Sequence, residues 1–157
     1  MPDPLDAVSP LDGRYAGRTR PLAPYASESA LLRARVHVEV EYLLALADLG
    51  ATPLSIDDDQ RAALRSLYED WDGEDAQLVK AIETEGYEDL SATNHDVKAV
   101  EYFVRLNLPD DLDAAQWIHF GLTSEDVNNL AHRLLVRGAV EDVLLPELES
   151  IRGTLTE

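Results

Sequence analysis

The stretch SESALLRARVHVEVEYLLALADLG, residues 27–50, decides the fold class of this chain. Its apolar residues recur at spacings of three and four, which predicts one long helix. Ser27 can cap the first turn, and Gly50 follows the last one. The alternation of Val36, Val38 and Val40 also fits a strand, but the unbroken stripe and the leucine- and alanine-rich ends favour the helix. The residues of this stripe are Leu32, Val36, Val40, Leu43, Leu44 and Ala47.

Downstream of this helix the pattern predicts three more helices. The first is capped by Ser55 or Asp57, and the next ends before a loop at residues 85–92. Thr93 then begins a helix with a buried valine stripe, which Pro109 closes.

A last, long helix is predicted from Thr123 or Ser124 to Glu157, after a short helix at Trp117. Pro146 should kink it, because proline lacks the amide donor and crowds the preceding turn. The helix reaches the last residue still in apolar register, as a truncated helix would. Its stripe consists of Val136, Val140, Val143, Leu144, Leu148, Ile151 and Leu155. With no convincing strand anywhere, the predicted class is all-α.

The first 26 residues are rich in helix-breaking residues. This density prevents a long helix and predicts an irregular, extended segment that must pack on something else to be ordered. The residues concerned are Pro2, Pro4, Pro10, Gly13, Gly17, Pro21 and Pro24.

The composition separates this chain from several protein classes. Its 157 residues, 45% of them apolar, suffice for one ordinary domain or for a piece of a larger protein. The 31 acidic against 13 basic residues give a formal net charge of −18. Such a surface would repel a nucleic-acid backbone or an anionic membrane. Carboxylates clustered at residues 57–59 and a scarcity of lysine also suggest adaptation to concentrated salt, where screening relieves self-repulsion.

Several kinds of chemistry are not indicated. Without cysteine, disulfide and thiolate chemistry are excluded. The first residues lack the features of a signal peptide, and no apolar stretch approaches membrane-spanning length, so a cytoplasmic protein without membrane contact is expected. No glycine-rich phosphate loop or nucleophile elbow occurs. His37, His95, His119 and His132 lack metal-ligand spacing, so no metal or cofactor is expected.

The segment TNHDVKAVEYF, residues 93–103, opens with more polar side chains than a helix cap needs. On spacing alone, the simplest interpretation is that Thr93 caps the helix, that Asp96 completes a capping box-like arrangement, and that His95 is solvated. A ligand above the helix end would give His95 a function, because helix amino ends favour anions and imidazole titrates near neutral pH.

Two other segments have the same ambiguity. HFGLTSEDVNNL, residues 119–130, is a helix start capped by Thr123 or Ser124. SPLDGRY, residues 9–15, is a turn that presents Arg14 and Tyr15. Arg14 suits forked binding of phosphate or carboxylate, although an arginine after a turn is usually only solvated or paired.

Three segments taken together resemble a known family. They are AVSPLDGRYAGRTRPLAPYASESALLRARVHVEVEYLLAL, TNHDVKAVEYF and IHFGLTSEDVNNLAHRLLV. In this order and at these separations they are similar to the amino-terminal third of a purine-pathway member of the fumarase/aspartase superfamily. The resemblance implies an amino-terminal helical domain at residues 1–110 and the start of a central helical bundle at 111–157. It also implies a homotetramer.

The same resemblance implies an enzyme that eliminates fumarate from adenylosuccinate, leaving AMP, and from the succinylated carboxamide ribotide of purine biosynthesis. Arg14 and Tyr15 would hold the nucleotide phosphate. The substrate pocket would be lined by Asn94, His95 and Asp96, with His95 assisting near the reacting groups. A carboxylate of the succinyl part would bind at Thr123 and Ser124.

The sequence also departs from that family. Its general-acid histidine lies in a Thr-His-Gly-Gln type segment and its general-base serine in a Ser-Ser-x-Met-Pro-x-Lys-x-Asn segment, and neither occurs here. The 157 residues alone are therefore expected to be inactive. One alternative is a non-catalytic interaction module whose helix at 124–157 pairs with a partner. Another is an independent acidic bundle with only an ancestral likeness.

Overall fold

The structure is a computed structural model that describes residues 5–50 and 52–156. Pro2, Pro4 and Glu157, which figure in the sequence predictions, lie outside these ranges. Within them the chain is all-α, as predicted, and extended pairing is limited to an isolated bridge between Tyr87 and Leu90. No helix in these ranges has the length and apolar character needed to cross a bilayer.

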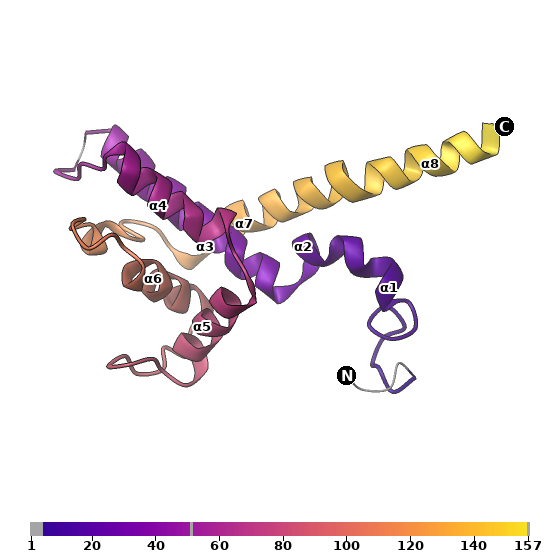
Figure 1. Ribbon diagram of the computed structural model, residues 1–157, viewed down its shortest axis with the longest axis horizontal. Coiled ribbons are helices and arrows are strands. Elements are labelled where there is room, and N and C mark those ends of the chain that lie inside the picture. The colour runs from indigo at the N-terminus through magenta and orange to yellow at the C-terminus, as the bar shows by residue number, and fades with distance from the viewer. Residues whose placement is uncertain (1–4, 51, 157) are drawn as a thin grey trace.

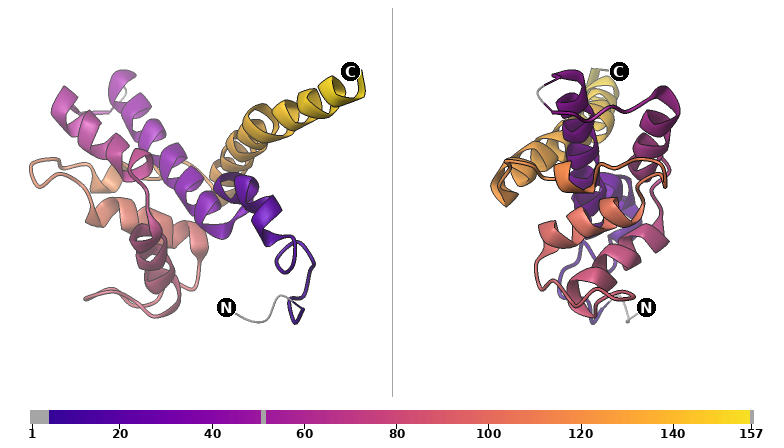
Figure 2. Two further views of the ribbon diagram at one scale, coloured as in Figure 1. Left: turned by 45° about the vertical axis from the view of Figure 1, so that its right-hand side comes forward. Right: turned by 90° about the vertical axis from the view of Figure 1, so that its left-hand side faces the viewer.

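The centre of the fold is α3, Glu28–Asp48, the helix predicted from the opening stretch. The Ser27 hydroxyl accepts the N–H of Ala30 at 3.1 Å, and Gly50 follows with φ +60°. In Figures 1 and 2 this helix runs through the middle of the molecule, and it contacts α4, α5, α6 and α7. The strand alternative for the valine alternation is therefore wrong.

Three helices cover one side of α3: α4 (Asp58–Glu69), α5 (Gly73–Thr84) and α6 (Asp96–Leu106). Asp57 caps α4 in a reciprocal capping box with Gln60, and Asp72 caps α5. Their apolar faces meet α3 in the larger of two buried clusters. Its most deeply buried members include Val36, Val40, Leu43, Leu64, Val79, Ile82, Val100, Phe103 and Val104.

The other side of α3 carries α7, Ser124–Gly138, which follows a short 3-10 helix η2 at Ala115–Trp117. A smaller apolar cluster of Ala34, Val38, Val97, Val127 and Ala131 joins α3, α6 and α7. The two amino ends with unusual polar composition, those of α6 and α7, thus lie over a shared cluster.

The last helix continues through a π-helical segment, η3 (Ala139–Leu144), into α8 (Leu145–Thr156). Figure 1 shows them as one continuous rod leading away from the rest of the molecule. The N–H of Leu145 donates to the carbonyl of Val140, five residues back. The wider turn accommodates Pro146, which lacks a donor and would crowd an α-helical turn. A π segment thus stands where the sequence predicts a kink.

The amino-terminal segment is more helical than the sequence predicts. It forms the short turns α1 (Ala16–Thr19), η1 (Arg20–Leu22) and α2 (Ala23–Ala26). Pro21 and Pro24 occupy first-turn positions, where the missing amide hydrogen is not needed. The prolines therefore prevent a long helix, as predicted, but the extended conformation predicted for residues 16–26 is wrong.

The amino-terminal turns are held to the last helix by Tyr25. Its hydroxyl donates to Asp142 at 2.7 Å, and its ring covers Gly138, where an added Cβ would lie only 2.8 Å from the ring atom Cδ1. We therefore expect Gly138→Ala to displace the ring and release residues 16–26, so that trypsin cleaves after Arg18 faster. The free energy of unfolding should change little, because the main core is not involved. Limited proteolysis with mass spectrometry measures the cleavage rates.

The matched control is Gly153→Ala, because Gly153 lies in the same rod and an added Cβ there meets nothing within 4 Å. That variant should be cleaved at the wild-type rate. Equal cleavage rates for the two variants would show that the Tyr25 contact does not hold the segment.

Candidate functional site

The first polar cluster, residues 93–96, lies at the start of α6. Its residues cap the helix in a different way from the one that the sequence spacing predicts. The helix begins at Asp96, and its cap is His95, whose Nδ1 accepts the N–H of Lys98 at 3.3 Å. The predictions that Thr93 begins and caps this helix and that His95 is only solvated are therefore wrong. Asn94 and His95 lie in the turn before the helix, not on it.

Backbone hydrogen bonds to α5 explain the later start. The N–H of Thr93 donates to the carbonyl of Ile82 at 3.1 Å, and that of Asn94 donates to Glu83 at 2.9 Å. Asn94 has φ +49°, a left-handed conformation that asparagine tolerates. These bonds hold residues 93 and 94 against the end of α5, so the helix cannot begin until His95.

The cap fixes the protonation pattern of a neutral His95 ring. Because Nδ1 accepts a backbone hydrogen bond, the ring proton is on Nε2. The side chain is 53% exposed. A neutral His95 can therefore donate a hydrogen bond from Nε2 to a ligand above the helix end.

The amino ends of α6 and α7 are joined by Arg35 of α3, a residue that the sequence analysis did not single out. Its guanidinium donates through Nε to Asn128 at 2.9 Å and pairs with Asp96 at 2.8 Å. The Arg35 side chain is only 6% exposed. Asp96 is the first residue of α6, and Asn128 lies in the second turn of α7. One buried side chain thus binds both helix starts.

The carboxylate of Asp96 is engaged on both oxygens. Oδ1 accepts the N–H of Val97 at 2.9 Å, and Oδ2 pairs with Arg35 at 2.8 Å. Desolvation alone would raise the pKa of Asp96, but the Val97 hydrogen bond and the Arg35 charge outweigh it and lower the pKa. Asp96 is therefore a carboxylate at neutral pH whose charge Arg35 balances.

The second predicted helix end is confirmed at Thr123, and α7 begins at Ser124. Asp126 accepts both the N–H of Thr123 at 2.7 Å and its hydroxyl at 2.8 Å. These hydrogen bonds lower the pKa of Asp126. The hydroxyl hydrogen of Thr123 is already donated within the helix start, so Thr123 would meet a ligand through its backbone or after rearrangement.

Arg14 and Tyr15 lie elsewhere in the chain. The Arg14 guanidinium stacks on the Tyr15 ring, 4.6 Å from the ring centroid. These residues directly precede α1, which Figures 1 and 2 show on the opposite side of the molecule from α6. Within one chain, the structure brings together two of the three predicted binding segments and leaves this one apart.

A buried ionisable cluster beneath the site was not predicted. Glu39 of α3 has no exposed surface, and its Oε1 lies 2.5 Å from Nδ1 of His119. Nε2 of the same ring lies 3.9 Å from Glu101 of α6, which also pairs with Lys98 at 2.6 Å. His119 has φ +60° and lies in the turn before α7. Its contact with Glu39 therefore anchors the turn that leads to Thr123.

Burial raises the pKa of Glu39 above its ordinary value, against the opposing effect of His119. Within the described ranges its Oε2 has no hydrogen-bond partner, which also favours the neutral acid. The folded state thus binds a proton at Glu39 more tightly than the unfolded state does. Stability from this group is present below the ordinary glutamate pKa and is lost as the pH rises through the raised value.

Glu39→Gln should remove that pH dependence. We expect the free energy of unfolding of the wild type, minus that of the variant, to fall as the pH rises from about 4 to about 8. Urea unfolding at several pH values measures the free energies of unfolding of both proteins. Subtracting one from the other removes the pH dependence that the other carboxylates contribute equally to both. A difference independent of pH would mean that Glu39 titrates alike in both states.

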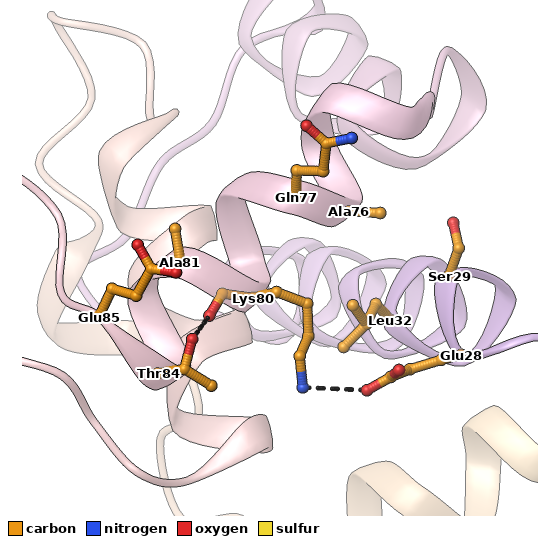
Figure 3. Close-up of a pocket in the computed structure, with 9 residues that line it drawn as sticks. All are labelled: Glu28, Ser29, Leu32, Ala76, Gln77, Lys80, Ala81, Thr84 and Glu85. Atoms are coloured by element: carbon orange, nitrogen blue, oxygen red, sulfur yellow. Dashed lines mark hydrogen bonds and ion pairs between the residues drawn. The ribbon is translucent and has the colours of Figure 1, made fainter. Parts of the chain in front are cut away.

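Two cavities adjoin α3, and the second of them reaches the α7 amino end at Leu122 and Asp126. One of about 430 Å³ lies between α3 and α5, and Figure 3 shows Lys80 reaching across it to Glu28, at 3.0 Å. Another, of about 390 Å³, lies between α3 and α7 and is lined by Val38, Tyr42 and Leu130 among others. No cluster of three or more potential metal ligands occurs among residues 5–50 and 52–156.

Known proteins resemble this chain over most of its length. The family model described as Lyase matches residues 13–157. Adenylosuccinate lyase of Dictyostelium discoideum is 42% identical over 152 residues, covering 92% of this chain and 31% of that protein. Adenylosuccinate lyase of Legionella pneumophila strain Corby is 37% identical over 157 residues, covering 97% of this chain and 33% of that protein.

Adenylosuccinate lyase of Escherichia coli K12 is 40% identical over 147 residues, which cover 90% of this chain and 31% of that protein. The chain therefore spans about a third of the length of the curated relatives that it matches.

Proposed function

This chain belongs to the lyase family, and from that premise we propose that it is the amino-terminal part of an adenylosuccinate lyase. The intact enzyme eliminates fumarate from adenylosuccinate, leaving AMP, and from the succinylated carboxamide ribotide. The observation that carries the proposal is the joining of the α6 and α7 amino ends by Arg35. Both polar clusters that carry the resemblance begin at these two ends.

The arrangement suits an anionic substrate. The first backbone N–H groups of a helix and its dipole attract negative charge, and two such ends close together reinforce each other. In the elimination, a base removes a proton from the carbon next to a carboxylate, the carbon–nitrogen bond breaks, and an acid protonates the nitrogen. The negative charge that develops on the succinyl part needs fixed donors, which helix ends provide without reorganisation.

We assign roles to the site residues on this basis. His95 donates from Nε2 close to the reacting groups, and Asn94 and Asp96 line the substrate pocket beside it. Thr123 and Ser124 bind a succinyl carboxylate at the α7 end. The principal acid and base would come from parts of the lyase outside these 157 residues.

Arg14 and Tyr15 would bind the nucleotide phosphate in a site formed between subunits, because they lie apart from α6 within one chain. This requires an oligomer, and a homotetramer is proposed. Residues 1–110 would form the amino-terminal domain and residues 111–157 the start of the bundle that assembles the subunits. A cytoplasmic enzyme that uses neither metal nor cofactor is proposed.

The test is an ultraviolet assay of adenylosuccinate cleavage. The 157-residue chain alone should show no turnover, whereas mixing it with the polypeptide encoded downstream in the same reading frame should restore turnover. Robust turnover by the chain alone would refute the assignment of the acid and base to other segments. An assembled mixture that lacks turnover would refute the proposed activity.

One observation favours a second candidate, a non-catalytic module that pairs with a partner helix. The apolar side chains of α8 are exposed: Leu148 is 60% exposed, Ile151 54% and Leu155 81%. Exposed apolar patches of this kind mark interaction surfaces. The two candidates differ in the downstream reading frame: the histidine and serine segments of the lyases would be found there for the enzyme and absent for the module.

The acidic surface leads to a further proposal, adaptation to concentrated salt. At a net charge of −18, self-repulsion opposes the compact state, and salt screens it. Unfolding by urea in about 0.05 M and about 2 M KCl, where the screening length shrinks several-fold, should show greater stability at high salt. Equal stability at the two concentrations would exclude the adaptation.

A further inference from the structure

Arg35 occupies an unusual place for a charged residue. Its side chain is 6% exposed and extends from the central helix into the junction of α6 and α7, where it meets Asp96 at 2.8 Å and Asn128 at 2.9 Å. A buried guanidinium is costly unless it is paired and hydrogen-bonded, and here one partner comes from each helix.

We propose that Arg35 is a positioning residue, which fixes the amino ends of α6 and α7 relative to each other and neutralises Asp96 so that an anion can bind there. This inference rests on the proposed function for the identity of the anion, a dicarboxylate or nucleotide. The geometric part can be tested without any ligand.

The shape of the guanidinium supports the positioning role. Its planar fork presents several donors in fixed directions, so two simultaneous bonds define both distance and orientation. Asp96 is the first residue of α6, directly after His95, and Asn128 lies four residues after Ser124. A shift of either helix along its axis would break one of the bonds.

Charge balance supports the second part of the role. Asp96 is a carboxylate beside the helix end where the proposed substrate carries negative charge, and alone it would repel that charge. Arg35 pairs with Asp96 from the buried side, and Asp96 keeps 46% of its side chain exposed. The α6 end can therefore attract an anion although an acidic residue opens the helix.

The apolar cluster under the fork does not require the charge. The residues that pack α3, α6 and α7 together in this cluster are Ala34, Val38, Val97, Val127 and Ala131, and Arg35 is not one of them. Arg35→Met keeps the length of an apolar stem and should keep this packing. A packing role and a positioning role for Arg35 therefore predict different results for the methionine variant.

Four variants of the 157-residue chain separate the two roles. Arg35→Met removes both polar bonds, Arg35→Lys keeps a charge near Asp96 without the fork, and Asn128→Ala removes only the α7 partner. Arg33→Met is the matched control, because Arg33 is exposed on the same helix. Urea unfolding first establishes that each variant is folded under the conditions used.

The readouts are the carboxyl titration of Asp96 by carbon-13 NMR and amide hydrogen exchange in the first turns of α6 and α7. In Arg35→Met the pKa of Asp96 should rise and both turns should exchange faster. Arg35→Lys and Asn128→Ala should keep the low pKa of Asp96 yet exchange faster in the first turn of α7, and Arg33→Met should match the wild type. A folded Arg35→Met chain with unchanged titration and unchanged exchange would overturn the proposal.

Binding of fumarate, followed by amide shifts at Val97 and Glu125, tests the link to function. Weaker binding by Arg35→Met than by the wild type is expected. If the wild type does not bind fumarate but the Asp96 and exchange results hold, the positioning role stands and the identity of the anion as a dicarboxylate is refuted. If the wild type and Arg35→Met bind equally well, the charge-balancing role is refuted.

Discussion

Leu43→Ala should lower the free energy of unfolding by about 2–5 kcal/mol. Leu43 has no exposed surface and lies on the central helix within the larger apolar cluster. The substitution removes apolar contacts and leaves a cavity that the rest of the cluster cannot readily fill, because α3 is held by helices on both sides. Equilibrium unfolding in urea, followed by circular dichroism, measures the change.

Leu49→Ala is the matched control, since Leu49 lies at the end of the same helix and is 73% exposed. Its effect should stay within about 0.5 kcal/mol. A loss below about 1 kcal/mol for Leu43→Ala would mean that the core around α3 collapses to fill the space, contrary to the packing described.

His95→Asn should lower turnover of the assembled lyase by about 10²–10³-fold, the usual cost of losing one donor to developing charge. Asparagine is a good helix cap, so the α6 start should survive while the imidazole and its Nε2 donor are lost. Adenylosuccinate cleavage by the chain combined with its complementary polypeptide gives the rate, and urea unfolding gives the stability.

His95→Ala provides the comparison, because it removes both the imidazole and the cap. Its turnover should fall as far as that of His95→Asn, while stability falls by a further amount of about 1 kcal/mol. If His95→Asn kept wild-type turnover and only His95→Ala lost it, the role of His95 would be capping alone.

The sequence predicted the helices well, and the central helix shows why one alternative arose. Val36 and Val40 pack into the larger cluster and Val38 into the smaller one, so α3 is buried on two sides. A helix enclosed in this way has apolar residues at positions that also alternate, as they do in a strand. The length of the apolar stripe correctly favoured the helix over the strand.

The start of α6 could not be predicted from local sequence. Thr93 is the better cap by propensity, but its backbone is bonded to Ile82 at the end of α5. Such long-range backbone bonds override capping preferences and are not visible in spacing. The start of α7 was predicted because Thr123 and Asp126 satisfy each other within one turn.

Arg35 and Glu39 were missed because the acidic composition makes charged residues uninformative. A usable signal did exist: the two lie four residues apart in a helix whose flanking positions are apolar on both sides, so they share a face with little access to solvent. Buried charges spaced in this way indicate partners in neighbouring elements. Their partners, Asn128 and His119, lie 93 and 80 residues away in sequence and could not be identified from it.

The π segment at Ala139–Leu144 sets the rotational phase of everything that follows it. Each residue of an α-helix turns the chain by about 100°, and a π turn absorbs one residue more than an α turn does. If the same residues formed an uninterrupted α-helix, Leu148, Ile151 and Leu155 would be rotated by about that angle relative to Leu130 and Leu134. The local widening of the helix therefore sets the direction in which these apolar side chains point. The residues that make up the apolar surface do not set it.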